Sequence, residues 1–361
     1  MTKENIRKPY LAVFLLLSII SCNTQQVISK EQAAALFYKK GLLLFHEKKY
    51  IEAEFTFNEA LKNKKDFAPA YEGLARVYLQ RGQLHKAENF AGQSLKLNKS
   101  WIPARIVLAR IFFAEGAYEL SRDELQLALK QMLNLDFPDI KSEIYVLLSQ
   151  NDLRQNSFAA AEKNAKKALE FQADNKQARK ILDEIAGIMR RLRGRGQPIQ
   201  QLATKSVINR ADLATLLHFE MKALLKDSAK VKRRALDVEK NHPAFTSIQW
   251  CLDYDLLPVL PDSAFYPGDR VDRAEMALFM YHILNTVFPD SAYHVCFDKE
   301  TRSYADVKPF HPYFIALNTI SALGMMDGKD GLFRARDPLS GLEAIKCIDR
   351  LKEIMRQLSV R

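Results

Sequence analysis

The sequence predicts a mainly α-helical protein with two helical domains behind an N-terminal export segment. Three observations indicate this: a spacing of 34 residues that recurs between residues 34 and 190, a second self-similarity with an offset of 68 or 69 after residue 235, and an apolar run near the N-terminus. At 361 residues the chain has room for two or three domains. Its 48% hydrophobic content is that of a folded protein and excludes a mainly disordered chain.

The N-terminus has the pattern of an export signal. Basic residues precede an apolar run over residues 10–20. Such a run is too short to span a bilayer, which takes about 20 residues. It matches the apolar core of a secretory signal, about 7–15 residues long. We therefore expect the chain to be exported.

The apolar run ends in Ile19-Ile20-Ser21-Cys22. This resembles the lipobox of bacterial lipoproteins, which implies a signal peptide over residues 1–21, lipidation of Cys22, and a lipidated tether over residues 22–33. Asn23 is not the Asp of enteric inner-membrane retention signals. The expected location is the cell envelope, anchored in the outer membrane facing the periplasm. The alternative is an ordinary secretory signal with an incidental cysteine.

Small residues recur at fixed positions from Ala34 onward. Three positions are small in each of the first three units: Gly41, Ala75 and Ala109; Ala53, Ala87 and Ser121; Ala60, Ser94 and Ala128. A fourth unit follows an insertion at residues 136–141. Small residues at fixed places let paired helices approach closely. This pattern resembles the tetratricopeptide repeat over residues 34–190, with about four repeats and a closing helix. The resemblance implies a solenoid whose concave groove binds a protein partner.

A different self-similarity occupies the C-terminal part. Asp237-Val238 and His242-Pro243 recur as Asp306-Val307 and His311-Pro312, an offset of 69. Phe265 and Phe333 follow at an offset of 68. Each unit is expected to form a short extended lead, a helix, a loop and a second helix. The two histidines at matching positions are more plausible as structural residues than as metal ligands.

This second pattern resembles the S-layer homology module. The resemblance implies an α-helical three-lobed domain over residues 207–361, with a truncated first module that starts at Val207, and a basic linker over 191–206. Residues 176–192 either close the repeats or form the front half of the first module, and the sequence leaves both options open.

The second helix of each module opens with a recurring motif. Asn209 and Asp272 are expected to cap these helices, with an acid three residues later closing a capping box. In the family, arginines of this motif bind acidic cell-wall glycan, and a guanidinium suits carboxylates because it can form two parallel hydrogen bonds. The candidate glycan-binding residues are Arg210, Asp212, Asp272, Arg273 and Glu275. In the last module the arginine is replaced by Gly341, so at most two family-like grooves are expected.

The positive charge is concentrated in one segment. The chain carries a net charge of +11, and residues 190–234 hold twelve Lys or Arg against three acids, a net +9. This segment is either a solvated junction between domains or a patch for an anionic polymer. Export makes nucleic acid a poor partner for it.

Catalytic chemistry has little support in the sequence. There is no zinc-protease motif, phosphate loop, nucleophile elbow or Cys-x-x-Cys pair, so no enzyme activity, cofactor or metal is expected. Of the remaining cysteines, Cys251, Cys296 and Cys347, buried free thiols are the expectation, although one disulfide is open.

The sequence predicts a non-enzymatic envelope lipoprotein. Its repeats would bind a protein partner, its C-terminal domain would bind peptidoglycan or an acidic wall glycan, and its lipid would bind the membrane. The alternative is an assembly or scaffold factor of a secretion- or pilus-type machine, whose C-terminal module binds protein. A glycan-active enzyme ranks third.

Overall fold

The computed structural model describes residues 29–225, 233–288, 304–308, 310–328 and 330–359. The described ranges are helical, with isolated bridges and no strand. None of the helices in these ranges is both long and apolar enough to cross a membrane. The chain divides into two compact units, Met1–Asp136 and Phe137–Arg361, which we call the N-terminal and C-terminal units. The export signal and Cys22 lie outside the described residues.

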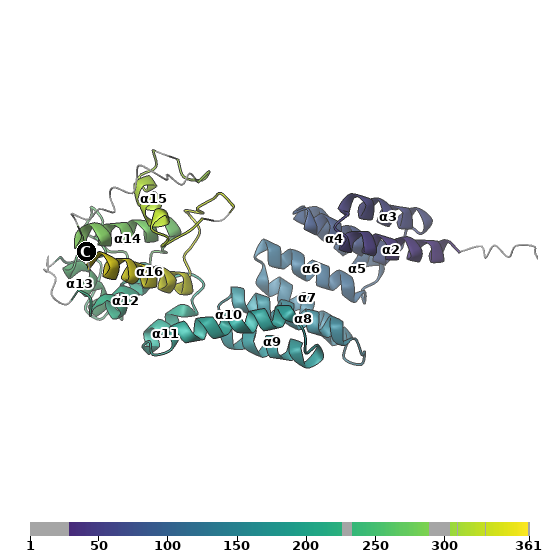
Figure 1. The fold of residues 1–361 in the computed structure, drawn as a ribbon, viewed down its shortest axis with the longest axis horizontal. Coiled ribbons are helices and arrows are strands. Elements are labelled where there is room, and N and C mark those ends of the chain that lie inside the picture. The colour runs from purple at the N-terminus through teal and green to yellow at the C-terminus, as the bar shows by residue number, and fades with distance from the viewer. Residues whose placement is uncertain (1–28, 226–232, 289–303, 309, 329, 360–361) are drawn as a thin grey trace, which may run out of the picture. The chain divides into compact units, whose positions relative to one another are not determined.

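In the described part of the N-terminal unit, residues 29–136, six helices form three antiparallel pairs (Figure 1). They are α2 (Lys30–His46), α3 (Tyr50–Asn63), α4 (Ala68–Gln80), α5 (Leu84–Leu97), α6 (Ile102–Glu115) and α7 (Tyr118–Gln131). Proline stands at the start of α4 and α6, where a missing N–H costs no hydrogen bond. The pairs coincide with the predicted 34-residue units.

The predicted small positions are the places where helices meet. All nine are buried in the structure. Phe57 shows why one of these positions is glycine: a Cβ at Gly41 would lie 2.5 Å from its ring, and a Cβ at Gly73 of α4, outside the nine positions, would lie 2.4 Å from it. One buried phenylalanine therefore fills the space that two neighbouring helices leave by carrying no side chain there.

The fourth repeat belongs to the C-terminal unit. It consists of α8 (Pro138–Arg154) and α9 (Phe158–Phe171), so the predicted insertion at 136–141 is shorter than expected and α8 begins inside it. The next helix, α10 (Lys176–Leu192), packs against α9 and α8 through Ala178, Ile181 and Ile185. Of the two options for residues 176–192, this packing on the last helix pair favours a helix that closes the repeats.

The segment 191–206, treated as a basic linker in the sequence, is structured. It contains a short helix, α11 (Gln197–Ala203), whose Ile199, Leu202 and Ala203 are buried. This helix packs on α12 (Arg210–Met221) and α16 (Gly341–Ser359). The front helix of the first C-terminal module is therefore α11.

Three modules surround a common axis in the C-terminal domain. The second helices are α12, α14 (Arg273–Val287) and α16, and the front helices are α11, α13 (Phe245–Asp253) and α15 (Phe314–Ala322). Each front helix packs on the second helix of another module: α13 on α12, α15 on α14 and α11 on α16. The modules therefore interlock.

A closed cycle of backbone hydrogen bonds marks the axis. The N–H of Ile208 donates to the carbonyl of Leu339 at 2.9 Å, Leu339 donates to Val271 at 2.9 Å, and Val271 donates back to Ile208 at 3.0 Å. These three residues are buried and directly precede the capping residues of the three second helices. The cycle fixes where each second helix starts.

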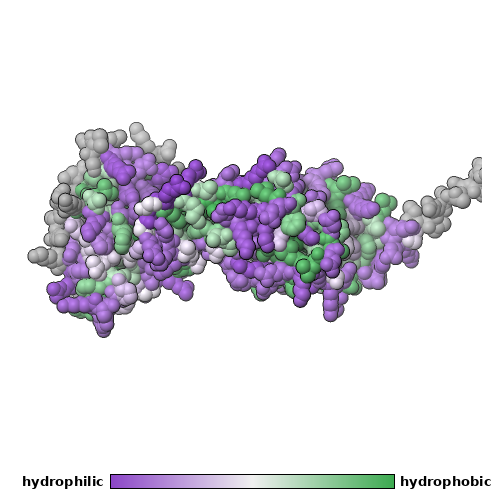
Figure 2. Space-filling model, turned by 90° about the horizontal axis from the view of Figure 1, so that it is seen from below, coloured by the Kyte–Doolittle hydropathy of each residue, from purple (hydrophilic) through white to green (hydrophobic). Residues whose placement is uncertain are grey.

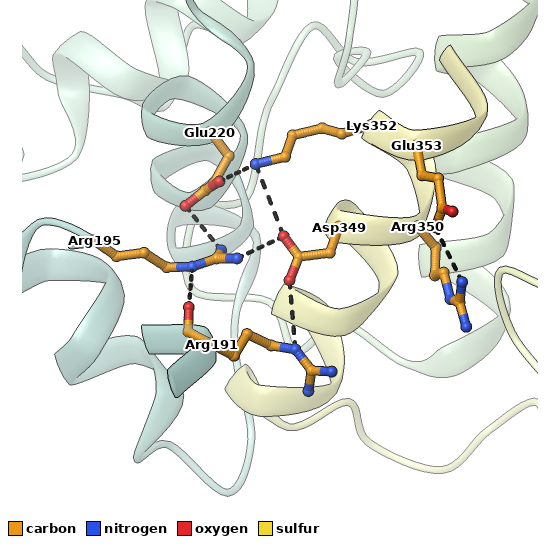
Figure 3. Close-up of polar contacts among 7 residues, drawn as sticks. All are labelled: Arg191, Arg195, Glu220, Asp349, Arg350, Lys352 and Glu353. Atoms are coloured by element: carbon orange, nitrogen blue, oxygen red, sulfur yellow. Dashed lines mark hydrogen bonds and ion pairs between the residues drawn. The ribbon is translucent and has the colours of Figure 1, made fainter. Parts of the chain in front are cut away.

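A charged cluster fastens the end of α10 to the C-terminal domain (Figure 3). The Arg195 guanidinium contacts Glu220 of α12 at 2.9 Å and Asp349 of α16 at 2.6 Å. Lys352 of α16 also pairs with Glu220, and Arg191 of α10 lies 3.7 Å from Asp349. Arg195 and Glu220 are 15% and 11% exposed, so this cluster differs from ordinary surface ion pairs. Two cations of the basic segment, Arg191 and Arg195, therefore form ion pairs within the C-terminal unit.

Candidate functional site: the module junctions of the C-terminal domain

The predicted capping boxes are present at α12 and α14. Asn209 accepts a hydrogen bond from the N–H of Asp212 at 2.8 Å, and the Asp212 carboxylate accepts one in return from the N–H of Asn209. Asp272 and Glu275 make the same exchange at 2.8 and 3.1 Å. Burial raises the pKa of Glu275. Both acids of the motif thus have a structural task, and Asp212 also pairs with Lys205 at 2.6 Å.

Arg210 is a buried arginine that joins two modules. Its side chain donates to the carbonyls of Phe265 at 2.7 Å and Pro258 at 3.0 Å, and its guanidinium lies 4.7 Å from the Phe265 ring centre. It is only 4% exposed, and this burial lowers its pKa. The contacts hold the loop of the middle module against the start of α12.

Arg273 repeats this arrangement one module later. It donates to the carbonyls of Phe333 at 3.0 Å and Asp327 at 2.7 Å, lies 4.9 Å from the Phe333 ring centre, and pairs with Glu343 of α16. Its side chain is 14% exposed. The two arginines that the sequence selects thus act as matching clamps between consecutive modules.

The third clamp position is closed by packing. Gly341 opens α16 where Arg210 and Arg273 open the other second helices. A Cβ on Gly341 would lie 1.8 Å from the carbonyl oxygen of Leu202 in α11. The junction between the last and the first module therefore has no room for any side chain at this position.

The Asp-Val motif forms a second repeated clamp. The Asp306 carboxylate accepts hydrogen bonds from the backbone N–H groups of Phe333, Arg334 and Ala335 at 2.8, 2.7 and 3.2 Å. Burial alone would raise the pKa of Asp306, but these N–H groups outweigh it and the pKa lies below its usual value. Asp237 holds Phe265 and Tyr266 in the same way at 2.7 and 2.6 Å.

This clamp holds a residue in the left-handed backbone region. Arg334 has φ 60° and its counterpart Tyr266 has φ 52°, a conformation that residues other than glycine rarely adopt. Asp306 holds the N–H groups of Arg334 and of its neighbours, and so stabilises the turn that sets the direction of the Arg334 side chain.

A groove of about 920 Å³ lies beside this turn, at the junction of the middle and last modules. Its cations are Lys308, Arg334 and Arg336, and its aromatic lining includes Phe310 and Tyr313. Phe310 is 98% exposed. Within the described ranges, no side chain pairs with any of the three cations.

The carboxylates of the groove are less available than its cations. Asp272, Asp306 and Asp337 also line it. Asp272 caps α14 and Asp306 holds the turn at Arg334, so two of the three accept backbone N–H groups. The groove therefore offers unpaired positive charge and aromatic surface, which suit an anionic ligand with apolar faces.

Of the five candidate glycan-binding residues, Asp272 lines this groove, and Arg273 directly follows it in the chain. Arg210, Asp212 and Glu275 do not line it. Sequence reasoning missed Lys308, Arg334 and Arg336, and also Phe310. The available signal was the basic and aromatic composition of the stretches on either side of the last module's front helix, residues 308–313 and 333–337.

The repeated histidines have matching structural roles. His242 accepts the N–H of Ala244 at 3.1 Å, and His311 accepts that of Tyr313 at 3.3 Å. The described part of the chain holds no group of three or more His, Cys, Asp or Glu that could bind a metal. Cys251 and Cys347 are buried free thiols, as expected, and burial raises the pKa of Cys347 to about 12. Cys296 lies outside the described residues.

Comparison with known families identifies both repeated patterns. The S-layer homology domain matches residues 236–277 and 303–345, and the tetratricopeptide repeat matches residues 68–100. A search of curated protein sequences found no significant match. Both matched families are non-catalytic, and S-layer homology domains imply association with the cell envelope.

Solved structures with similar folds contain tetratricopeptide repeats. PilF of Pseudomonas aeruginosa is 16% identical with a TM-score of 0.41, over 55% of this chain and 95% of that chain. A thermophilic repeat protein of Thermus thermophilus is 20% identical with a TM-score of 0.39, over 53% and 94%. MamA of Desulfovibrio magneticus is 14% identical with a TM-score of 0.33, over 44% and 96%. These similarities concern the fold alone.

Two independent self-similarities, the helix pairs that they form and the family matches agree. The chain contains tetratricopeptide repeats and, in its C-terminal part, an S-layer homology domain.

Proposed function

We propose that this protein is a non-enzymatic envelope lipoprotein that links a protein partner to the cell wall. The repeats hold the partner, and the C-terminal domain binds peptidoglycan or an acidic wall glycan. The observation that carries the proposal is the groove of about 920 Å³ in which, among the described residues, three unpaired cations lie beside aromatic rings. Aromatic faces stack on sugar rings, while arginine and lysine meet carboxylate or phosphate groups of the polymer.

The predicted residues have different positions relative to the groove. Asp272 lines it, and Arg273, the next residue in the chain, holds the carbonyls of Phe333 and Asp327. We assign Arg273 to positioning the groove wall, with any glycan contact secondary to that. Arg210, at 4% exposed, offers almost no surface to a polymer. We assign the contacts with the wall polymer instead to Lys308, Arg334 and Arg336.

The test is sedimentation of the purified protein with isolated sacculi. Arg334→Gln combined with Arg336→Gln should weaken binding about tenfold, which corresponds to about 1.4 kcal/mol. Arg350→Gln with Arg356→Gln removes the same charge from exposed positions on α16 outside the groove and should bind like the wild type. Binding should also fall as salt rises, because exposed charges are screened over about 8 Å at physiological ionic strength.

Undiminished binding by the folded groove variant would contradict the wall-binding role. The protein would then fit the second candidate, an assembly or scaffold factor of an envelope machine whose C-terminal domain binds protein. One observation favours that candidate: Gly341 leaves the third junction without an arginine and packed against Leu202, so the domain has fewer family-like glycan positions than its three modules could supply.

The lipid anchor is a separate part of the proposal. It is supported by the Ile19-Ile20-Ser21-Cys22 pattern after an apolar run. Cys22→Ser should leave the precursor uncleaved by lipoprotein signal peptidase and without lipid, as judged by gel mobility and fatty-acid labelling. A Cys22→Ser chain that is still processed and still needs detergent for extraction would refute the anchor.

A further inference from the structure

The first repeat leaves an apolar face of α2 uncovered. Leu36 and Leu43 are 59% and 65% exposed. They are seven residues apart and so lie on one face of the helix. Figure 2 shows hydrophobic surface exposed on the N-terminal unit. Isolated exposed leucines are common, so this face needs a further argument.

The other repeats of the N-terminal unit supply that argument. At the positions that correspond to Leu36 and Leu43, α4 has Ala70 and Val77, which are fully buried. In α6 the corresponding residues, Ala104 and Ile111, are fully buried as well. These positions are where each repeat packs on the one before it. The Leu36–Leu43 face of α2 thus has the form of an inter-repeat contact, and no described residue covers it.

The two ends of the repeat region differ in the polarity of their outer faces. At the C-terminal end, α10 covers the last pair with buried Ile181 and Ile185, while most of its exposed positions are charged. Terminal repeats normally present such a polar outer face to keep the protein soluble. A leucine pair retained at the N-terminal end therefore indicates a surface that is covered in the working protein.

Lysines flank the leucine pair on both sides. At 100° per residue, Lys39 lies to one side of the Leu36–Leu43 line and Lys40 to the other. Both lysines are exposed. An apolar stripe with lysines along its edges is typical of helices that lie in a membrane interface, where the ammonium groups reach anionic headgroups.

The chain brings this face close to the proposed anchor. Ser29 caps α2 and lies seven positions after Cys22 in the chain. Seven residues span at most about 25 Å. If Cys22 carries the lipid, as proposed above, the start of α2 is held within that distance of the bilayer. Tethering gives the face a high effective concentration at the membrane, so that even a weak affinity for lipid is sufficient for binding.

We infer that the Leu36–Leu43 face of α2 docks on the phospholipid bilayer that holds the anchor, with Lys39 and Lys40 at anionic headgroups. The inference rests on the proposed anchor for its biological setting. We infer a lipid surface as the partner of this face, in preference to a second copy of the chain or a helix from another protein.

The experiment tethers the protein chemically, so that it does not depend on lipidation in the cell. The chain from Cys22 onward, with Cys296→Ser, is coupled through the Cys22 thiol to a maleimide lipid in vesicles of phosphatidylethanolamine and phosphatidylglycerol. Cys251 and Cys347 are buried with raised pKa and should not react. Tryptophan is introduced by Leu43→Trp in one sample and by Leu127→Trp in the control, a 42% exposed position on α7.

Brominated acyl chains in the vesicles should quench the tryptophan of Leu43→Trp several-fold more than that of Leu127→Trp, with Trp101 and Trp250 common to both. Lys39→Glu with Lys40→Glu should reduce this difference. Equal quenching at the two positions overturns the inference. Shielding of the Leu43→Trp side chain that needs no brominated lipid and grows with protein density would assign the face to a second copy and also overturn it. The Cys22→Ser experiment described above tests the natural anchor independently.

Discussion

One residue decides how many junctions of the C-terminal domain carry an arginine clamp. Arg210 and Arg273 each hold two carbonyls of the following module. Gly341 occupies the third place because the Leu202 carbonyl lies where its Cβ would be. The departure from the motif is visible in the sequence. Its cause is not, because Leu202 belongs to a segment whose composition indicates a linker.

Gly341→Ala should therefore destabilise the protein. A methyl group at this position must displace backbone, an overpacking that costs about 1–3 kcal/mol. Gly187→Ala is the matched control: it lies within α10 with open space around its Cβ position, and it should raise stability by up to about 1 kcal/mol. Urea unfolding followed by circular dichroism measures both. Equal stabilities of the two variants would contradict the packing of α11 on α16.

The same limit applies to the candidate site. Sequence reasoning found the Arg-x-Asp/Glu motif because it repeats, and its capping boxes are present. It could not show that Arg210 would be buried, since the carbonyls that hold it belong to Pro258 and Phe265 in another module. The groove cations Arg334 and Arg336 were missed because exposed charges in a loop follow no periodicity. Only the fold reveals that Asp306 holds this loop in place.

At the scale of elements, helices were predicted correctly where a sequence pattern repeats over many residues. The 34-residue spacing predicted the helix pairs that α2 to α7 form. Prediction failed at α11, where seven residues give too few turns for an amphipathic pattern and Arg, Gly and Pro dominate the composition just before and at its start. The buried trio Ile199, Leu202 and Ala203 has helical spacing, but it can be recognised only once α12 and α16 are seen to cover it.

At the scale of the whole molecule, the boundary between the repeats and the C-terminal domain differs from the predicted one. The sequence predicts a linker between them at residues 191–206. In the structure a single hydrophobic cluster continues across that segment, from Val146 in α8 through Ile185 and Leu202 to Met355 in α16. The Arg195 cluster adds ion pairs across the same junction (Figure 3). The fourth repeat and the S-layer homology domain therefore share one core.

This predicts which fragments fold. Residues 137–361 should unfold in one cooperative transition in urea, because their core is continuous.

Residues 207–361 keep all of the second helices but lose Ile199 and Leu202, each worth about 1.5–3 kcal/mol of burial. They also lose Arg195, which leaves Glu220 with Lys352 alone. The shorter fragment should be less stable by about 3 kcal/mol or more, with its apolar surface exposed to a dye such as anilinonaphthalene sulfonate. If residues 207–361 instead unfold at the same urea concentration as residues 137–361, the S-layer homology domain is autonomous and α10 and α11 are only a connection to it.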